Sequence, residues 1–259
     1  MPRLVSYVSL TPMSLVSANK KRDLIKELFK VGAHFGYSRS RRHPSATPFI
    51  FGFKNRTAVI DLEKAEAQLE AAKAFVASIA ASGKKVLLVG TKPEARAPLT
   101  SVAEDLAMPY VAGRWLGGTL TNFSQMKKRM ERLAELKADK EKGGFARFTK
   151  REQSRLAKEM SDLERYFGTL TSLKEMPGVM VVIDSREEEI AVSEAKKLGV
   201  PVVSLSGTDC NLNLVTYPVV GNDAQVASIK FFLEEIGEAY KFGIIQASAP
   251  TNHDEHKSN

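Results

Sequence analysis

Cysteine is almost absent from this chain, since Cys210 is the only one in 259 residues. A single cysteine excludes an intrachain disulfide and a cysteine-rich zinc site, and it fits a reducing compartment. No run of about 18 apolar residues occurs, so no membrane span is expected. Residues 1–18 contain no acid and no clean apolar core segment, which favours a flexible N-terminal tail over a signal peptide. Residues 244–259 are expected to form a second flexible tail.

The motifs of several enzyme classes are also missing. The chain has neither a G-x-x-x-x-G-K-[ST] phosphate loop nor a G-x-G-x-x-G dinucleotide fingerprint. No histidine lies near Cys210 in the sequence, so no Cys/His catalytic pair is expected, and the histidines show no metal-ligand spacing. We therefore predict no catalytic residue, no cofactor, no metal and no small-molecule substrate. The Val89–Lys92 turn and the Gly117–Thr119 loop leave open an alternative, an enzyme of doubly wound fold that binds a phosphorylated ligand.

Acidic residues are scarce in two parts of the chain. The net charge is +8, but residues 20–56 carry ten Lys/Arg against two acids, and residues 114–174 carry fifteen against eight. Residues 175–259 carry six basic and thirteen acidic residues. Basic charge that is clustered in this way favours a polyanionic partner such as nucleic acid.

Short apolar runs alternate with helical segments through most of the chain. Strands are predicted at Thr57–Asp61, Lys85–Gly90, Tyr110–Val111, Val179–Asp184, Val200–Leu205 and Thr216–Val220. Helices are predicted from Ser17 or Asn19 to Val31, at Glu63–Ala81, Pro93–Ala107 and 187–198, and from a cap at Asp223 to Tyr240. This alternation predicts a three-layer α/β/α sandwich with a parallel, flavodoxin- or Rossmann-like sheet, built from residues 19–121 and 169–243.

Residues 122–168 follow a different rhythm. Apolar side chains step by three and four residues in two stretches, Phe123–Leu136 and Leu156–Phe167, and charged residues fill the other positions. Gly143 and Gly144 separate the two stretches. The pattern predicts an antiparallel helical hairpin of coiled-coil type, inserted into the sheet domain.

The best candidate for contact with RNA is the segment 37–56, which has no regular periodicity. It interleaves basic residues with Phe49, Ile50, Phe51 and Phe53, of which Phe49 and Phe51 are expected in the core. Arginine binds phosphate through two parallel hydrogen bonds and stacks on bases, so basic loops suit folded RNA. The predicted RNA-binding residues are Arg39, Arg41, Arg42, Lys54 and Arg56, with Arg114, Lys127 and Lys128 as weaker candidates.

Several blocks in fixed order resemble the bacterial family of small ribosomal subunit protein two, from about residue 22 to residue 243. The blocks are Gly32–Gly36, Arg41–Pro44, Pro48–Gly52, Asn55–Arg56, Ile60–Lys64, Val86–Lys92, Arg114–Phe123, Pro177–Asp184, Ala191–Pro201 and Pro218–Ala224. The resemblance implies an α/β/α sandwich with a protruding hairpin. It also implies a non-catalytic, cytoplasmic component of the small ribosomal subunit, which binds ribosomal RNA and neighbouring proteins, including the large messenger-binding protein one.

Three departures from the family pattern stand out. Tyr37 replaces a common second histidine, and His43-Pro44 replaces a more usual Trp-Asn-Pro. Gly207–Leu212 stands where Asp-Thr-Asn-Cys-Asp-Pro is common, so the contacts of that loop are not carried over from the family.

The enzyme of doubly wound fold is one alternative to a ribosomal protein. A second alternative is an adaptor that binds only protein, through the helical hairpin.

Overall fold

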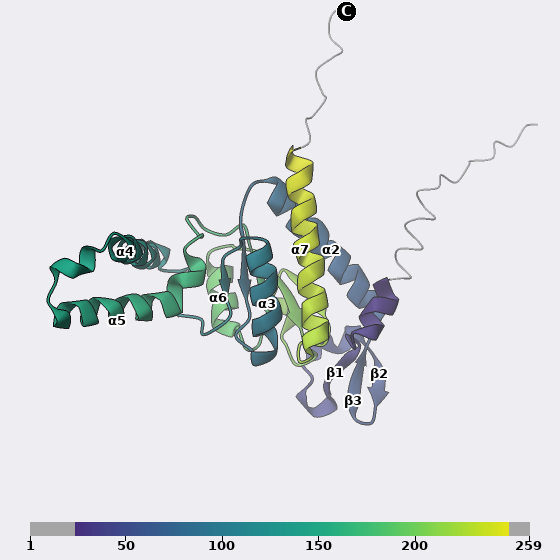
Figure 1. Cartoon of the computed structure of the whole chain (residues 1–259). Coiled ribbons are helices and arrows are strands. Elements are labelled where there is room, and N and C mark those ends of the chain that lie inside the picture. The colour runs from purple at the N-terminus through teal and green to yellow at the C-terminus, as the bar shows by residue number, and fades with distance from the viewer. Residues whose placement is uncertain (1–23, 249–259) are drawn as a thin grey trace, which may run out of the picture.

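The computed structural model describes residues 24–248, and Figure 1 shows the arrangement of their helices and strands. Residues 24–30 are helical, as predicted, but the predicted start of that helix and the tail 1–18 lie outside the described residues. Within residues 24–248, no helix is both long enough and apolar enough to cross a bilayer.

The centre of the molecule is a five-stranded parallel sheet. Its strands are β4 (Val86–Val89), β5 (Tyr110–Val111), β6 (Val179–Ile183), β7 (Val202–Ser206) and β8 (Tyr217–Val220). Their order in the sheet is β5-β4-β6-β7-β8. Strands β4, β6 and β7 are buried throughout, as expected for a parallel sheet covered on both faces. The chain winds outwards in both directions from the junction of β4 and β6, which is where folds of this kind bind ligands.

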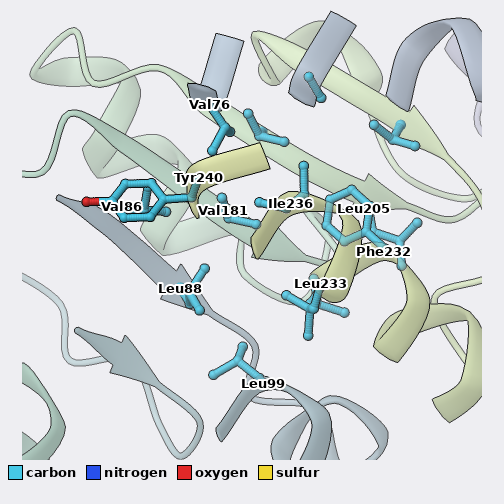
Figure 2. Packing of buried hydrophobic residues seen from close by; sticks show 14 of the residues in the cluster. Val76, Val86, Leu88, Leu99, Val181, Leu205, Phe232, Leu233, Ile236 and Tyr240 are labelled. Carbon is cyan, nitrogen blue, oxygen red and sulfur yellow. The ribbon is translucent and has the colours of Figure 1, made fainter. Parts of the chain in front are cut away.

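Helices cover both faces of the sheet, which gives the predicted three layers. One face packs against α2 (Leu62–Ala81), α3 (Pro93–Asp105) and α7 (Val226–Ser248). Figure 2 shows this core, in which Val86 and Leu88 of β4 meet side chains of α3 and α7. The alternate residues Leu87 and Val89 join the cluster on the other face, where α6 (Glu189–Lys197) packs. Burial of each large aliphatic side chain contributes about 1.5–3 kcal/mol.

Helices α4 (Phe123–Glu141) and α5 (Lys150–Phe167) contact each other and lie on one side of the molecule (Figure 1). Their buried side chains come from the predicted apolar positions: Met130, Leu133, Leu136, Met160, Leu163 and Phe167. Gly143 ends α4 with a φ of 67°, in the left-handed region that glycine enters without strain. The two predicted helices and the break between them are therefore confirmed.

The N-terminal segment forms a second sheet that the sequence did not predict. The predicted strand Thr57–Asp61 is present, but it lies in this sheet and not in the parallel one. Strands β1 (Phe35–Ser38), β2 (Ile50–Lys54) and β3 (Thr57–Ile60) are antiparallel, in the order β1-β3-β2. Two short 3-10 helices, η1 (Arg39–Arg41) and η2 (Pro44–Phe49), connect β1 to β2. The β2–β3 turn has positive φ at Asn55 and Arg56, 48° and 68°, which is the type I′ geometry. The turn lacks the glycine that is typical of this geometry, so the sequence did not predict the hairpin.

The predicted burial of Phe51 is wrong. The pairing register of β2 and β3 shifts between Ile50 and Gly52, and the extra residue in this bulge is Phe51, which is 82% exposed. Phe49 is half-buried and packs against a cluster that contains Ala46 and Ile60. A one-residue bulge reverses the face of a side chain, and sequence alternation does not reveal it.

The C-terminal helix also differs from its prediction. Helix α7 begins at Val226, not directly after Asp223, and continues past Tyr240 to Ser248. Asp223 is not its cap, because the Asp223 carboxylate is turned to Lys92 instead. The predicted tail from residue 244 thus begins with helical residues, and residues 249–259 lie outside the described part.

Candidate nucleic-acid interface

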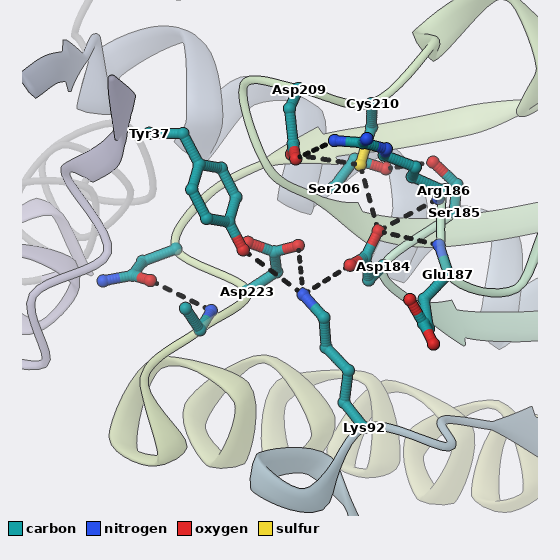
Figure 3. Close-up of polar contacts among 12 residues, drawn as sticks. Tyr37, Lys92, Asp184, Ser185, Arg186, Glu187, Ser206, Asp209, Cys210 and Asp223 are labelled. Carbon is teal, nitrogen blue, oxygen red and sulfur yellow. Dashed lines mark hydrogen bonds and ion pairs between the residues drawn. The ribbon is translucent and has the colours of Figure 1, made fainter. Parts of the chain in front are cut away.

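The crevice at the carboxyl edge of the sheet is filled by a lysine and two carboxylates (Figure 3). Lys92, directly after β4, forms ion pairs with Asp184 after β6 and with Asp223 after β8, the latter at 3.0 Å. Burial acts to lower the pKa of Lys92, but the two carboxylates outweigh it and raise this pKa, so the ammonium stays charged. Burial and the charge of Asp184 raise the pKa of Asp223 to about 6. The positive charge of Lys92 therefore offsets the repulsion between the two buried carboxylates.

This arrangement leaves little room for a bound nucleotide or metal. Ligand atoms of Asp184, Cys210 and Asp223 lie within 4.8 Å of one another, a spacing that suits a cation, but the Lys92 ammonium already bonds both carboxylates. The carboxylate of Glu188 accepts a hydrogen bond of 2.6 Å from the Thr91 backbone N–H, at the start of α3, where a phosphate would bind. Cys210 is fully buried, and burial raises the pKa of its thiol, so this thiol is a poor nucleophile.

The N-terminal sheet covers the same edge. The Tyr37 backbone N–H donates to Thr208 Oγ1 at 2.9 Å, and the His43 backbone N–H donates to the Thr208 carbonyl at 2.9 Å. A Cβ at Gly36 would lie 2.6 Å from Thr208 Cγ2, so glycine is required for this close approach. The Tyr37 hydroxyl accepts a hydrogen bond of 3.3 Å from Lys92, and burial, with Asp223 beside it, raises the Tyr37 pKa to about 12. The site of a doubly wound enzyme is thus used here to dock the basic N-terminal segment.

The predicted RNA-binding residues fall into two separate groups. Arg39, Arg41, Lys54 and Arg56 are exposed and Arg42 is half-buried, all within η1 and the β1–β3 sheet or beside them. Residues 35–60 contain no Asp or Glu. The second group, which is also exposed, follows β5 and opens α4, on the opposite side of the molecule in Figure 1: Arg114, Lys127 and Lys128.

Arg186 lies beside the first group, and the sequence did not predict it. Its Nη1 atom donates at 2.8 Å to Asp209 Oδ2, the same oxygen that accepts from Arg41 Nη2 at 3.4 Å. Arg186 follows β6, more than 140 positions away from Arg41 in the chain. An isolated arginine in an acidic region carries no signal in the sequence, so only the fold reveals this neighbour.

Glu194 of α6 accepts hydrogen bonds that hold the loop between β5 and α4 in place. Its Oε1 atom accepts from the Trp115 indole at 3.2 Å and from the Gly118 N–H at 2.7 Å. Its Oε2 atom accepts from the Leu120 and Thr121 backbone N–H groups at 3.0 and 3.1 Å. Burial acts to raise the pKa of Glu194, but these hydrogen bonds outweigh it and lower this pKa. The backbone of this loop, from Gly118 to Thr121, therefore binds a carboxylate of the protein itself, where the enzyme alternative required a phosphorylated ligand.

A group of exposed aromatic side chains lies beside the basic residues. Phe29 stacks on His34 with ring centroids 4.4 Å apart, and His34 contacts Phe35 at 4.1 Å. Phe29 and Phe35 are 63% and 51% exposed, and Phe51 is exposed separately, on β2 at the other edge of the same sheet. Large exposed aromatic side chains are typical of binding surfaces.

Comparison with known proteins gives consistent matches over most of the chain. The family model described as ribosomal protein S2 matches residues 28–243. The chain is 40% identical to the small ribosomal subunit protein uS2 of Coprothermobacter proteolyticus, over 83% of this chain and 80% of that protein. It is 40% identical to the protein of the same name from Endomicrobium trichonymphae, over 83% and 88%. The protein of that name from Chloroflexus aggregans is 38% identical, over 83% and 90%.

Proposed function

Because the chain belongs to the ribosomal protein S2 family, we infer that it is a structural component of the small ribosomal subunit. The observation that carries this inference is the match over residues 28–243, together with relatives 40% identical over 83% of the chain. The protein binds small-subunit ribosomal RNA and neighbouring ribosomal proteins, acts on the ribosome in the cytoplasm and catalyses no reaction. The filled crevice at Lys92 agrees with a family that has no enzymatic role.

The primary RNA contact is the basic N-terminal group, Arg39, Arg41, Arg42, Lys54 and Arg56. Its support is that four of these five side chains are exposed, on a segment without acids that the Thr208 hydrogen bonds dock on the core. Docking holds the charges on a rigid base and lowers the entropy lost on binding. Arg56 supports this contact separately. It has a left-handed φ that glycine would adopt without strain, so a functional use of the arginine side chain accounts for the strained residue.

The second basic group, Arg114, Lys127 and Lys128, makes a separate and weaker RNA contact. It stands near the root of α4 and α5, which we take as an antiparallel coiled-coil hairpin of residues 122–168. Ion pairs support that assignment, with Arg132 Nε 3.2 Å from Glu159 Oε1 and Lys137 Nζ 2.6 Å from Glu164 Oε1. We take residues 19–121 and 169–243 as the core domain, which α7 extends as far as Ser248.

Charge reversal compares the two basic groups directly. Arg41→Glu with Arg42→Glu is expected to prevent incorporation into small subunits while the isolated protein stays folded, because Arg41 is exposed, Arg42 is only half-buried, and Arg186 remains as the partner of Asp209. Lys127→Glu with Lys128→Glu reverses the same number of charges in the second, weaker group and is expected to reduce incorporation less. Sedimentation of tagged protein with small subunits measures incorporation, and circular dichroism measures folding. Normal incorporation of the first variant and loss of the second would move the principal RNA contact to the hairpin.

The exposed aromatic group is the proposed docking surface for a protein partner, the large messenger-binding protein one. Its support is the exposure of Phe29, Phe35 and Phe51, since aromatic anchors carry much of the energy of protein interfaces. Phe51→Ser removes no buried contact and should leave the melting temperature unchanged. In small subunits purified with the Phe51→Ser variant, mass spectrometry is expected to find less protein one than in subunits with the wild-type chain. Full occupancy by protein one would assign the aromatic group to another partner.

A further inference from the structure

Arg41 and Arg186 share a single buried acceptor. The Asp209 side chain is 3% exposed, and its Oδ2 atom accepts from Arg186 at 2.8 Å and from Arg41 at 3.4 Å. The two arginine side chains are 58% and 56% exposed. One carboxylate therefore holds two guanidinium groups near each other while leaving most of their surface to solvent.

Arg41 is held on a second side. Its guanidinium carbon lies 4.6 Å from the centre of the Tyr37 ring, close enough for a cation–π contact. Tyr37 is in turn fixed by its hydrogen bonds to Thr208 and Lys92. The Arg41 head group is therefore preorganised by the same contacts that dock the N-terminal sheet.

The remaining donors of the two arginines match one phosphate group. Each guanidinium has five N–H donors in a planar fork, and one from each is used on Asp209. Because both groups bond to the same oxygen atom, the two guanidinium groups lie close together, at a separation that one phosphate can bridge. Two arginines against one aspartate leave a net positive charge at this point.

We propose that Arg41 and Arg186, positioned by Asp209, form a two-arginine site for one backbone phosphate of the ribosomal RNA. The proposal rests on the proposed function. It adds Arg186, which comes from the acidic C-terminal third of the chain, to the RNA contacts. It also gives a role to the altered Gly207–Leu212 loop, because Asp209 stands where the family pattern has Asn, and a neutral amide cannot form ion pairs with two arginines.

An acidic protein segment is the competing occupant, because a carboxylate also accepts bidentate bonds from arginine. The phosphate is favoured by the surroundings: Arg39 and Arg42 are near in the chain, and residues 35–60 hold no acid. A sequence-independent contact to a charged backbone suits such a surface.

The test uses small ribosomal subunits reconstituted without this protein, to which the full chain is added back at several salt concentrations. Arg186→Gln is expected to weaken binding about threefold to tenfold and to reduce the slope of log K against log salt by less than about 0.9, the value for a whole phosphate contact, because Arg41 still binds the phosphate. Arg155→Gln on α5 removes the same charge from an exposed position and is the matched control. Equal effects of the two variants would refute the site.

Asp209→Asn separates orientation from charge. If charge alone matters, this variant gains a positive charge and binds more tightly. If Asp209 positions the arginines, binding weakens about threefold in spite of the added charge, provided that the melting temperature confirms folding. Unchanged or tighter binding overturns the proposal.

A cross-linker attached at position 186 identifies the molecule that contacts this site in the small subunit. Arg186→Cys can be labelled selectively with a photoactivated reagent because the native Cys210 is fully buried. Cross-links to ribosomal RNA support the phosphate site, and cross-links to protein alone overturn it. Failure of the wild-type chain to bind the subunits would overturn the proposed function itself, whereas wild-type binding with an unaffected Arg186→Gln variant overturns only this site.

Discussion

Glu194 offers the sharpest test of how the fold is held together, because one carboxylate accepts four N–H hydrogen bonds from the loop between β5 and α4. Glu194→Gln keeps the shape of the side chain but turns one acceptor oxygen into a donor. If the amide nitrogen replaces Oε1, then Trp115 and Gly118 lose their acceptor, and if it replaces Oε2, then Leu120 and Thr121 lose theirs. Either orientation leaves two donors unsatisfied.

The cost follows from burial. A buried donor without a partner costs about 1–3 kcal/mol. Trp115 and Leu120 are 7% and 2% exposed, whereas Gly118 and Thr121 are reached by water and lose less. We expect Glu194→Gln to destabilise the protein by about 2–4 kcal/mol, since each orientation affects one buried donor and one accessible donor. At about 2–4 °C per kcal/mol for a chain of this size, the melting temperature falls by about 4–16 °C.

Trp115 is the only tryptophan, so its fluorescence reports on this contact directly. The assay is thermal unfolding followed by Trp115 emission, with Glu189→Gln, an exposed position on the same helix, as the control. The Glu194→Gln variant should unfold earlier, and its emission should shift to longer wavelength. Equal melting temperatures and unchanged emission for both variants would refute the reasoning.

The pH dependence has a definite sign. Because the folded pKa of Glu194 is lowered, its contribution to stability is complete above the unfolded pKa of about 4.3 and is lost as pH falls through the folded pKa. Wild-type Trp115 emission should therefore keep its buried form as pH falls to about 4.3 and should change only at lower pH, where Glu194 binds a proton. The Glu194→Gln variant should lack this acid transition in Trp115 emission. A wild-type transition above that pH would contradict the lowered pKa.

Two further predictions concern single residues. Lys92→Met leaves Asp184 and Asp223 buried without a cation and should cost about 3–5 kcal/mol at pH 7 in urea unfolding. The loss should shrink towards pH 5, because the raised pKa of Asp223 lets it bind a proton in the folded state, and a variant as stable as wild type at pH 7 would contradict the role of Lys92. Arg56→Gly relieves a left-handed φ and should stabilise the isolated protein by about 0.5–1 kcal/mol while weakening its binding to small subunits. Unchanged binding would remove Arg56 from the RNA contacts.

The strands and helices of the core could be predicted because their patterns are local. Continuous apolar runs such as Val86–Val89 are typical of buried parallel strands, and the three-and-four spacing of Met130, Leu133 and Leu136 is typical of a packed helix. Ordered blocks such as Arg114–Phe123 were sufficient to indicate the family, which the later comparison confirmed.

The antiparallel N-terminal sheet could not be predicted because its signals are irregular. Its hairpin turn uses Asn55 and Arg56 without a glycine, and its bulge turns Phe51 towards solvent. Sequence alternation assumes an unbroken pleat, and each of these features breaks it.

By itself, the sequence determined the layered core, the two helices α4 and α5, the clustered basic charge and the family. Only the tertiary structure decided which distant side chains meet: Lys92 with Asp184 and Asp223, Glu194 with the Trp115 loop, and Arg186 with Arg41 through Asp209. Periodicity and motif spacing report on neighbours along the chain. Ion pairs at the carboxyl edge of a parallel sheet join residues separated by whole helices and strands, so their partners appear only once the sheet order is set.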